Sequence, residues 1–168
     1  MGLAHPLAGA AALVLSLSFA PGAMAADHRV PVGNADFSMP AEDCGFPIDV
    51  AFLADKEYIV KTRDDADGSS TLRVTGKLRV SFTNTDADKT IVANASGPGS
   101  LTLTDDGGVF NSQGLTFTYL SPEEQAVTGL PGLVFMAGHS VTAVDTDFNV
   151  TAWSLSGRWV DGCALLSG

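Results

Sequence analysis

The feature that most constrains how this chain folds is a period-two alternation of apolar and polar residues, rich in Thr and Val. In segment 71–84 the apolar residues share one parity, and they are Leu72, Val74, Leu78, Val80 and Phe82. The same alternation runs through 89–96, 100–106, 115–120 and 140–160. Such alternation is typical of half-buried β-strands, which place apolar side chains on the core face and polar ones in solvent.

Short turn signals separate the alternating segments at hairpin spacing. They contain Gly, Asp or Pro and lie at 67–68, 85–88, 96–99, 105–108 and 137–138. Such close connections predict antiparallel strands without crossover helices. Beyond the N-terminal segment, the one helix-like stretch is 121–127 (SPEEQAV). There Ser121 suits the N-cap, Pro122 the first helical position and Glu124 the third.

The number of strands predicts an all-β fold in one domain. Roughly eight to ten short strands at this spacing are expected of a β-barrel or a β-sandwich. We favour a single antiparallel β-barrel, because a meander that brings its first and last strands together removes the edges of the sheet. A β-sandwich is the alternative. The outline resembles the closed barrels of the lipocalins and allene oxide cyclases, a likeness of architecture that assigns no function.

The N-terminal residues predict secretion. Segment 7–20 (LAGAAALVLSLSFA) is uncharged and apolar, and it is followed by Pro21-Gly22 and by the small-x-small pattern Ala23-Met24-Ala25. We therefore expect a signal peptide over 1–25, an N-terminal arm over 26–43 and the β-barrel domain over 44–168, although segment 1–6 contains no Lys or Arg. The apolar segment is shorter than the roughly 20 residues of a membrane span, so no membrane anchor is expected after cleavage.

The two cysteines, Cys44 and Cys163, are predicted to form a disulfide. Cys44 lies too far beyond the cleavage site for lipid attachment, and the motif CGFP has Pro47 where a redox motif needs a second cysteine. A catalytic thiol needs a nearby base, and neither His28 nor His139 stands in a recognisable protease setting. Two cysteines in an oxidising compartment most often pair, and closing so long a loop stabilises by about 4–5 kcal/mol.

The charge balance and the absence of certain motifs limit the kinds of partner and cofactor that the protein is expected to bind. Nineteen Asp and Glu oppose nine Lys and Arg, a net charge of −10. Because nucleic acids and anionic membranes bind basic patches, we expect neither as a partner. The sequence has no HExxH motif and no cluster of His or Cys, so no metal and no cofactor is predicted. Segment 63–74 carries Gly68 at the sixth position of a calcium loop, but Arg63 and Val74 stand where that loop needs acids.

Three short motifs resemble those of a set of small secreted proteins of actinobacteria. They are CGFP at 44–47 before an alternating strand, SGPG at 96–99, and the ending SLSGRWVDGC at 154–163. Those proteins carry Cys-Gly-Phe-Pro near the mature start and a Leu-Ser-Gly-Arg…Asp-x-Cys element at the end. The resemblance implies a secreted β-rich domain bracketed by its two cysteines. It carries over no catalytic residue and no activity.

Two sets of residues are candidates for a functional site. The first could line the interior of the barrel and bind a small apolar ligand, with an ordinary packed core as the competing interpretation; it comprises Phe82, Phe117, Tyr119, Trp153, Leu155 and Trp159. The second consists of His139, Asp145 and Asp147, which with Glu123 and Glu124 could supply acid and base at one mouth of the barrel. Surface hairpin residues are the competing interpretation for this second set.

Three classes of function therefore stay open. The first is a secreted carrier that binds a small apolar molecule in the barrel. The second is a cofactor-free cyclase or isomerase, which needs an inward ionisable group with a perturbed pKa. The third is a structural or protein-interaction module with a filled core. A cavity of roughly 300 Å³ or more would favour the first two classes over the third. The sequence leaves the oligomeric state open.

Overall fold

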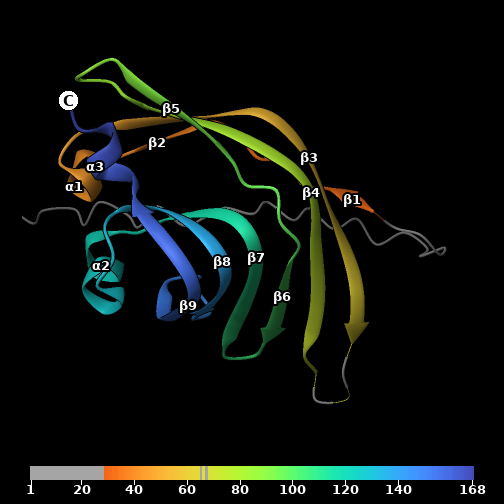
Figure 1. The fold of residues 1–168 in the computed structure, drawn as a ribbon. Helices are drawn as coiled ribbons and strands as arrows, with labels where there is room; N and C mark the ends of the chain where they lie inside the picture. Colours follow the sequence, from red (N-terminus) through yellow and green to blue (C-terminus); the bar gives the residue numbers. More distant parts are fainter. Residues whose placement is uncertain (1–28, 65, 67) are drawn as a thin grey trace, which may run out of the picture.

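The computed structural model describes residues 29–64, 66 and 68–168. The signal peptide predicted over 1–25 lies outside the described residues. Within them, the chain forms one antiparallel sheet of nine strands and three short helices (Figure 1). The predicted all-β class, the antiparallel pairing and the number of strands are confirmed.

The strands pair in an order close to the chain order. They are β1 (Val30–Pro31), β2 (Phe37–Met39), β3 (Ile48–Asp64), β4 (Ser70–Asn84), β5 (Lys89–Asn94), β6 (Gly99–Thr104), β7 (Gly107–Tyr119), β8 (Leu133–Val144) and β9 (Val150–Asp161). The helices are α1 (Ala41–Cys44), α2 (Pro122–Thr128) and α3 (Gly162–Leu166). Pairing follows β1-β3-β4-β6-β7-β8-β9, with β2 beside β3 and β5 beside β4. The predicted N-terminal arm thus contributes two strands to the sheet.

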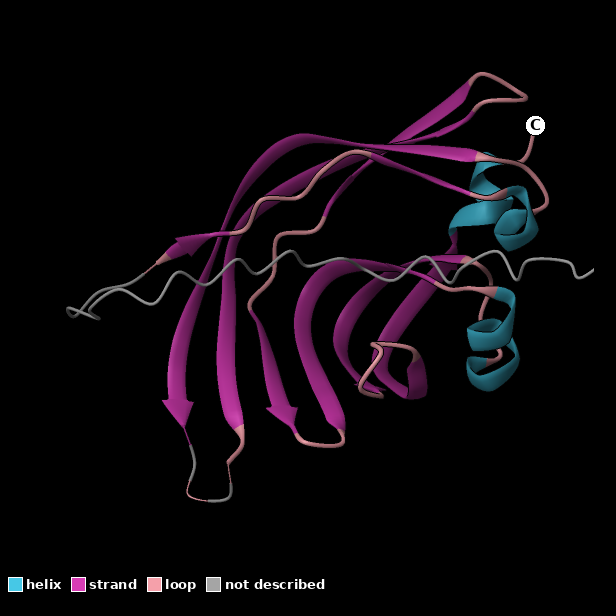
Figure 2. Ribbon diagram, turned by 180° about the vertical axis from the view of Figure 1, so that it is seen from behind, coloured by secondary structure: helices cyan, strands magenta, loops and turns pink. Residues whose placement is uncertain are grey.

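The sheet is not closed. Within the described residues, β9 pairs only with β8, and no hydrogen-bonded ladder joins it to β1 or β2. Figures 1 and 2 show instead that the sheet curls, so that the end formed by β2, β3, β4 and β5 lies over β7 and β8. α3 packs against both β5 and β8, so it connects the two layers where a closed barrel would have paired strands.

A row of glycines lets the sheet curl. Gly114, Gly138 and Gly157 are cross-strand neighbours on β7, β8 and β9, and all three have positive φ. A Cβ at Gly138 would collide with the carbonyl oxygen of Ser156 and lie 2.8 Å from the Cα of Gly157. The backbones therefore approach more closely than side chains allow. The turn predicted at 137–138 is wrong, because these glycines continue β8 through a bend.

The alternation predicted over 140–160 is interrupted by a turn between β8 and β9. The Asp145 carboxylate accepts hydrogen bonds from the backbone N–H groups of Asp147 and Asn149, both at 2.9 Å. Asp side chains favour such local bonds over a strand ladder. Asp145 and Asp147 consequently lie in a turn and not in a strand.

The predicted short helix is confirmed as α2. Ser121 Oγ accepts from the backbone N–H of Glu124 at 3.3 Å, and the Glu124 carboxylate accepts from the N–H of Ser121 at 2.8 Å. This is a capping box, with Pro122 in the first turn and Gly129 ending the helix in the left-handed conformation.

The main core lies between the two layers. Phe82 of β4 is fully buried and contacts Phe117 of β7 and Phe135 of β8, with ring centroids 5.0 and 5.2 Å apart in edge-to-face geometry. Met39, Ile48, Val50, Val80 and Leu133 complete this cluster. Val80 and Phe82 of β4 enter this cluster together because alternate residues of a strand share one face.

The C-terminus is fixed over this core. Leu166 of α3 is fully buried, and its carbonyl oxygen accepts a hydrogen bond from Nδ2 of the buried Asn84 at 3.0 Å. The predicted disulfide between Cys44 and Cys163 is confirmed, with Cα atoms 5.2 Å apart across 119 residues of sequence. It joins α1, just before β3, to α3, just after β9.

Reduction of the disulfide should strongly destabilise the protein. Opening a loop of this length restores chain entropy to the unfolded state, which costs about 4 kcal/mol and corresponds to a fall in Tm of about 10 °C or more. Calorimetry with and without a reductant checks this, and Cys44→Ser with Cys163→Ser should reproduce the reduced Tm. An unchanged Tm in both cases would contradict a structural role for the bond.

Substitution of Gly138 should also lower stability. Gly138→Ala forces a Cβ against the backbone of β9 in a positive-φ conformation, at an expected cost of about 2–3 kcal/mol. Gly33→Ala is the matched control, because a Cβ there meets nothing within 4 Å. Chemical denaturation of the two variants should show a loss only for Gly138→Ala, and equal stability would show that the bend tolerates side chains.

Candidate functional site

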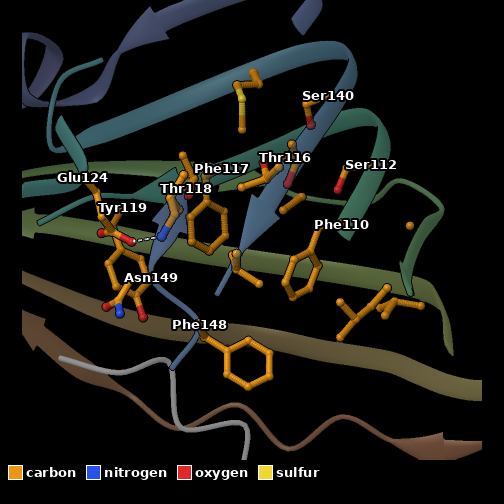
Figure 3. A pocket seen from close by; sticks show the side chains of 18 of the residues that line it. Phe110, Ser112, Thr116, Phe117, Thr118, Tyr119, Glu124, Ser140, Phe148 and Asn149 are labelled. Atoms are coloured by element: carbon orange, nitrogen blue, oxygen red, sulfur yellow. Dashed lines mark hydrogen bonds between the residues drawn. The ribbon is translucent and has the colours of Figure 1, made fainter. Parts of the chain in front are cut away.

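A cavity of about 1130 Å³, partly open to solvent, lies between the two layers of the curled sheet (Figure 3). Residues of β3, β4, β6, β7 and β8 line it, together with α2 and the turn between β8 and β9. The volume exceeds the roughly 300 Å³ that a small-molecule site needs.

The floor of the cavity is apolar. Ile59 of β3, Leu72 of β4 and Leu101 of β6 are buried and form a second core cluster, against which Val74 and Phe110 pack. All five side chains also line the cavity. They are cross-strand neighbours, since Ile59 pairs with Val74, and Leu101 pairs with both Leu72 and Phe110. A molecule that enters would therefore displace water from a continuous hydrocarbon surface.

Beside this floor, β7 and β8 carry a row of small hydroxyl side chains that line the cavity, which are Ser112, Thr116, Ser140 and Thr142. Ser112 and Ser140 are directly paired across β7 and β8, and Figure 3 shows both side chains on the cavity side. Ser140 is only 4% exposed. Within the described part of the chain, no hydrogen bond is formed by its hydroxyl group. Small side chains here explain why the interior is hollow, and their hydroxyl groups are free to bond a ligand.

One carboxylate, that of Glu57, lies beside the apolar floor. Glu57 of β3 lines the cavity two residues from Ile59, and it is paired with Gly76 of β4. Because Gly76 has no side chain, nothing from the paired position on β4 covers the carboxyl group. Burial, and secondarily the charge of Asp55, raises the pKa of Glu57 from 4.5 to about 7. Among the described residues, none donates a hydrogen bond or a positive charge to it.

A group of acids lines the cavity near α1 and α2. Burial, assisted by the charges of Glu42, Glu124 and Glu123, raises the pKa of Asp43 to about 6. Burial also raises the pKa of Tyr119, with the charges of Glu124 and Asp43 adding to the effect. Glu124 itself has a structural role, because its carboxylate accepts from the N–H groups of Ser121 and Val150.

Every charged residue that lines the cavity within the described chain is acidic. These residues are Glu42, Asp43, Glu57, Glu123, Glu124, Asp145 and Asp147. The lysines and arginines whose side chains are described are exposed elsewhere. The cavity therefore combines an apolar floor with a uniformly negative electrostatic potential.

The residues of the predicted aromatic set lie in different parts of the structure. Phe117 and Tyr119 line the cavity. Phe82 lies in the main core, and Trp153 and Leu155 pack against a third cluster formed by Leu120, Leu130, Val134 and Met136. Trp159 is 45% exposed. Among the described buried side-chain polar atoms, Nε1 of Trp153 alone has no hydrogen-bond partner.

The predicted polar set is also divided. Asp145 and Asp147 line the cavity from their turn, whereas His139 is exposed on β8 and does not line it. Hydrogen bonds from the side chain and backbone of Asn149 lower the pKa of Asp145. Sequence reasoning missed Glu57, Ser112, Ser140 and Phe110. The inward parity of Glu57 with Ile59 could have indicated the first of these residues.

Two further observations concern metals and membranes. The described residues contain no group of three or more His, Cys, Asp or Glu side chains arranged to hold a metal ion. In the same part of the chain, no helix has the length and apolar character needed to cross a membrane. Comparisons with protein-family models, with curated proteins and with solved structures found no match.

The raised pKa of Glu57 predicts a specific pH dependence of stability. The folded protein keeps this proton between about pH 4.5 and 7, where the unfolded chain has lost it, so stability falls as pH rises through that window. Glu57→Gln should remove this fall. After allowance for solvent screening of a partly exposed group, we expect the variant to be about 1 kcal/mol more stable than the parent at about pH 8.

Calorimetry at about pH 4.5 and pH 8 measures this difference, which should vanish at the lower pH. Asp88→Asn removes the same charge from the exposed turn between β4 and β5 and should leave the pH dependence unchanged. A Glu57→Gln protein with the parent's pH profile would show that the carboxyl group is fully solvated.

Proposed function

We propose that the protein binds a small, largely apolar molecule in the cavity between the two layers of the sheet. The observation that carries this proposal is the cavity itself, about 1130 Å³ with a floor of Ile59, Leu72, Val74, Leu101 and Phe110. Apolar side chains that line a hollow partly open to solvent stay in contact with water, so the protein forgoes the stabilisation that burying them in a packed core would give. A site that binds a ligand explains why small residues are kept there.

The fold and the disulfide support a carrier that acts outside the cell. We propose that the curled sheet surrounds its ligand as an incomplete barrel, with the open side giving access. The disulfide between Cys44 and Cys163 supports secretion, because such bonds persist in oxidising compartments. It also fixes α1 to α3 at the filled end of the sheet.

Uptake of a neutral fluorescent probe tests the proposal. N-phenyl-1-naphthylamine should become fluorescent on entering the cavity. Ser112→Trp places a large ring among the hydroxyl side chains and should weaken probe affinity by about tenfold or more, equivalent to 1.4 kcal/mol. Ser156→Trp adds the same ring at an exposed position of β9 and should leave the affinity unchanged. Absence of probe binding to the parent protein, or equal affinity of both variants, would contradict the proposal.

A cofactor-free isomerase or cyclase is the second candidate. The observation that favours it is Glu57, an ionisable group beside the cavity with a pKa of about 7, which suits a general acid or base near neutral pH. The two functions differ in the fate of the bound molecule. A carrier releases the bound molecule unchanged, whereas an isomerase or cyclase releases an isomer of the same mass. Chromatographic retention and the NMR spectrum of the molecule released after incubation distinguish the two outcomes.

A further inference from the structure

The charge of the cavity indicates what kind of apolar molecule it accepts. Seven carboxyl groups and no described basic side chain line it. Acids are common on a protein with a net charge of −10, so their presence alone identifies no ligand. The separation of the charges is more specific, because the described basic side chains are exposed and none lines the cavity. An anionic ligand would enter against this potential.

The hydroxyl side chains on β7 and β8 are an independent indication that the ligand places a polar group in the cavity. Ser140 as a whole residue is only 4% exposed, it lines the cavity, and its hydroxyl group has no hydrogen-bond partner among the described residues. The hydroxyl oxygen is not among the fully buried unpartnered atoms, so it keeps accessible surface. Buried hydroxyl groups normally have a partner, because leaving one unpaired costs free energy. Ser112 faces it across β7 and β8. Two adjacent hydroxyl groups, each able to donate and to accept, point to a polar group of the ligand at this position, and the acidic lining decides that this group is a cation.

Glu57 is the third observation that indicates a positively charged group on the ligand. Its carboxyl group lies beside Ile59 and Val74 at the apolar floor, and no described cation neutralises it. A carboxylate withdrawn from water without a counter-charge is unfavourable, and a positively charged ligand group would compensate it. Phe110, Phe117 and Phe148 also line the cavity, and aromatic faces attract organic cations.

Building on the proposed function, we propose that the natural ligand is an amphipathic organic cation. Its hydrocarbon body lies on the floor formed by Ile59, Leu72 and Leu101. The Glu57 carboxylate is the ionic partner that we assign to its ammonium group, and the hydroxyl groups of Ser112 and Ser140 are further polar groups in the lining of the same cavity. The other carboxyl groups of the lining add to the attraction for the cation, and the apolar floor binds its hydrocarbon body.

Three ligands with the same ten-carbon body and different head groups test this inference. They are decylamine, which is cationic, decanol, which is neutral, and decanoate, which is anionic. Each competes with N-phenyl-1-naphthylamine at low ionic strength and about pH 8.5, where Glu57 is ionised and the amine is still protonated. We expect decylamine to bind at least about tenfold more tightly than decanol, and decanoate to bind most weakly.

Glu57→Gln should reduce the preference for decylamine over decanol by about tenfold while the affinity for decanol stays the same. Asp88→Asn, with the same loss of charge far from the cavity lining, should keep the full preference. The Tm of each variant confirms that it is folded.

The outcomes separate this inference from the proposed function. If the probe binds but decanol or decanoate competes as well as decylamine, the cation inference is overturned and the binding function stands. If Glu57→Gln and Asp88→Asn lose the preference equally, the selectivity comes from net charge, and the assignment to Glu57 is overturned. If neither the probe nor any of the three ligands binds the parent protein, the proposed function itself fails.

Discussion

The architecture depends on the contact of Phe82 with Phe117 and Phe135. Because hydrogen bonding does not close the sheet within the described residues, its two ends are held together by side chains. The three rings meet edge to face with centroids 5.0 and 5.2 Å apart and are surrounded by fully buried aliphatic residues. Burial of this aromatic surface is the principal favourable term that offsets bending the sheet.

The disulfide and α3 reinforce that contact at one end only. Cys44 and Cys163 join the segments that enter β3 and leave β9, and Asn84 bonds the carbonyl group of Leu166 above Phe82. Along β7 and β8 the lining includes the small side chains of Ser112, Thr116, Ser140 and Thr142, which leave space between the layers. The solid core and the cavity therefore adjoin one another, and Leu78, Phe117 and Tyr119 belong to both.

The cavity brings carboxyl groups next to apolar side chains, although carboxyl groups are usually solvated. The raised pKa values of Asp43 and Glu57 show that carboxyl groups there lose hydration without gaining cationic partners. Such an arrangement favours either protons or a positively charged ligand, because both relieve the same unfavourable charge. Carrier and enzyme would use this property differently, the former to retain a cation and the latter to exchange a proton. Both proposals assign the central role to Glu57, whose paired residue on β4, Gly76, has no side chain to cover it.

Local patterns in the sequence determined the strands, the capped helix and the cysteine pair. Alternation in 71–84 and the Ser121–Glu124 spacing are short-range signals, because residues close in sequence determine the strand and the helix cap. The tertiary structure alone decided that Gly138 bends a strand, that Phe82 fills the core while Phe117 also lines the cavity, and that Glu57 and Ser140 line the same cavity. These outcomes depend on which strands face each other, a long-range property of packing that period-two patterning leaves undetermined.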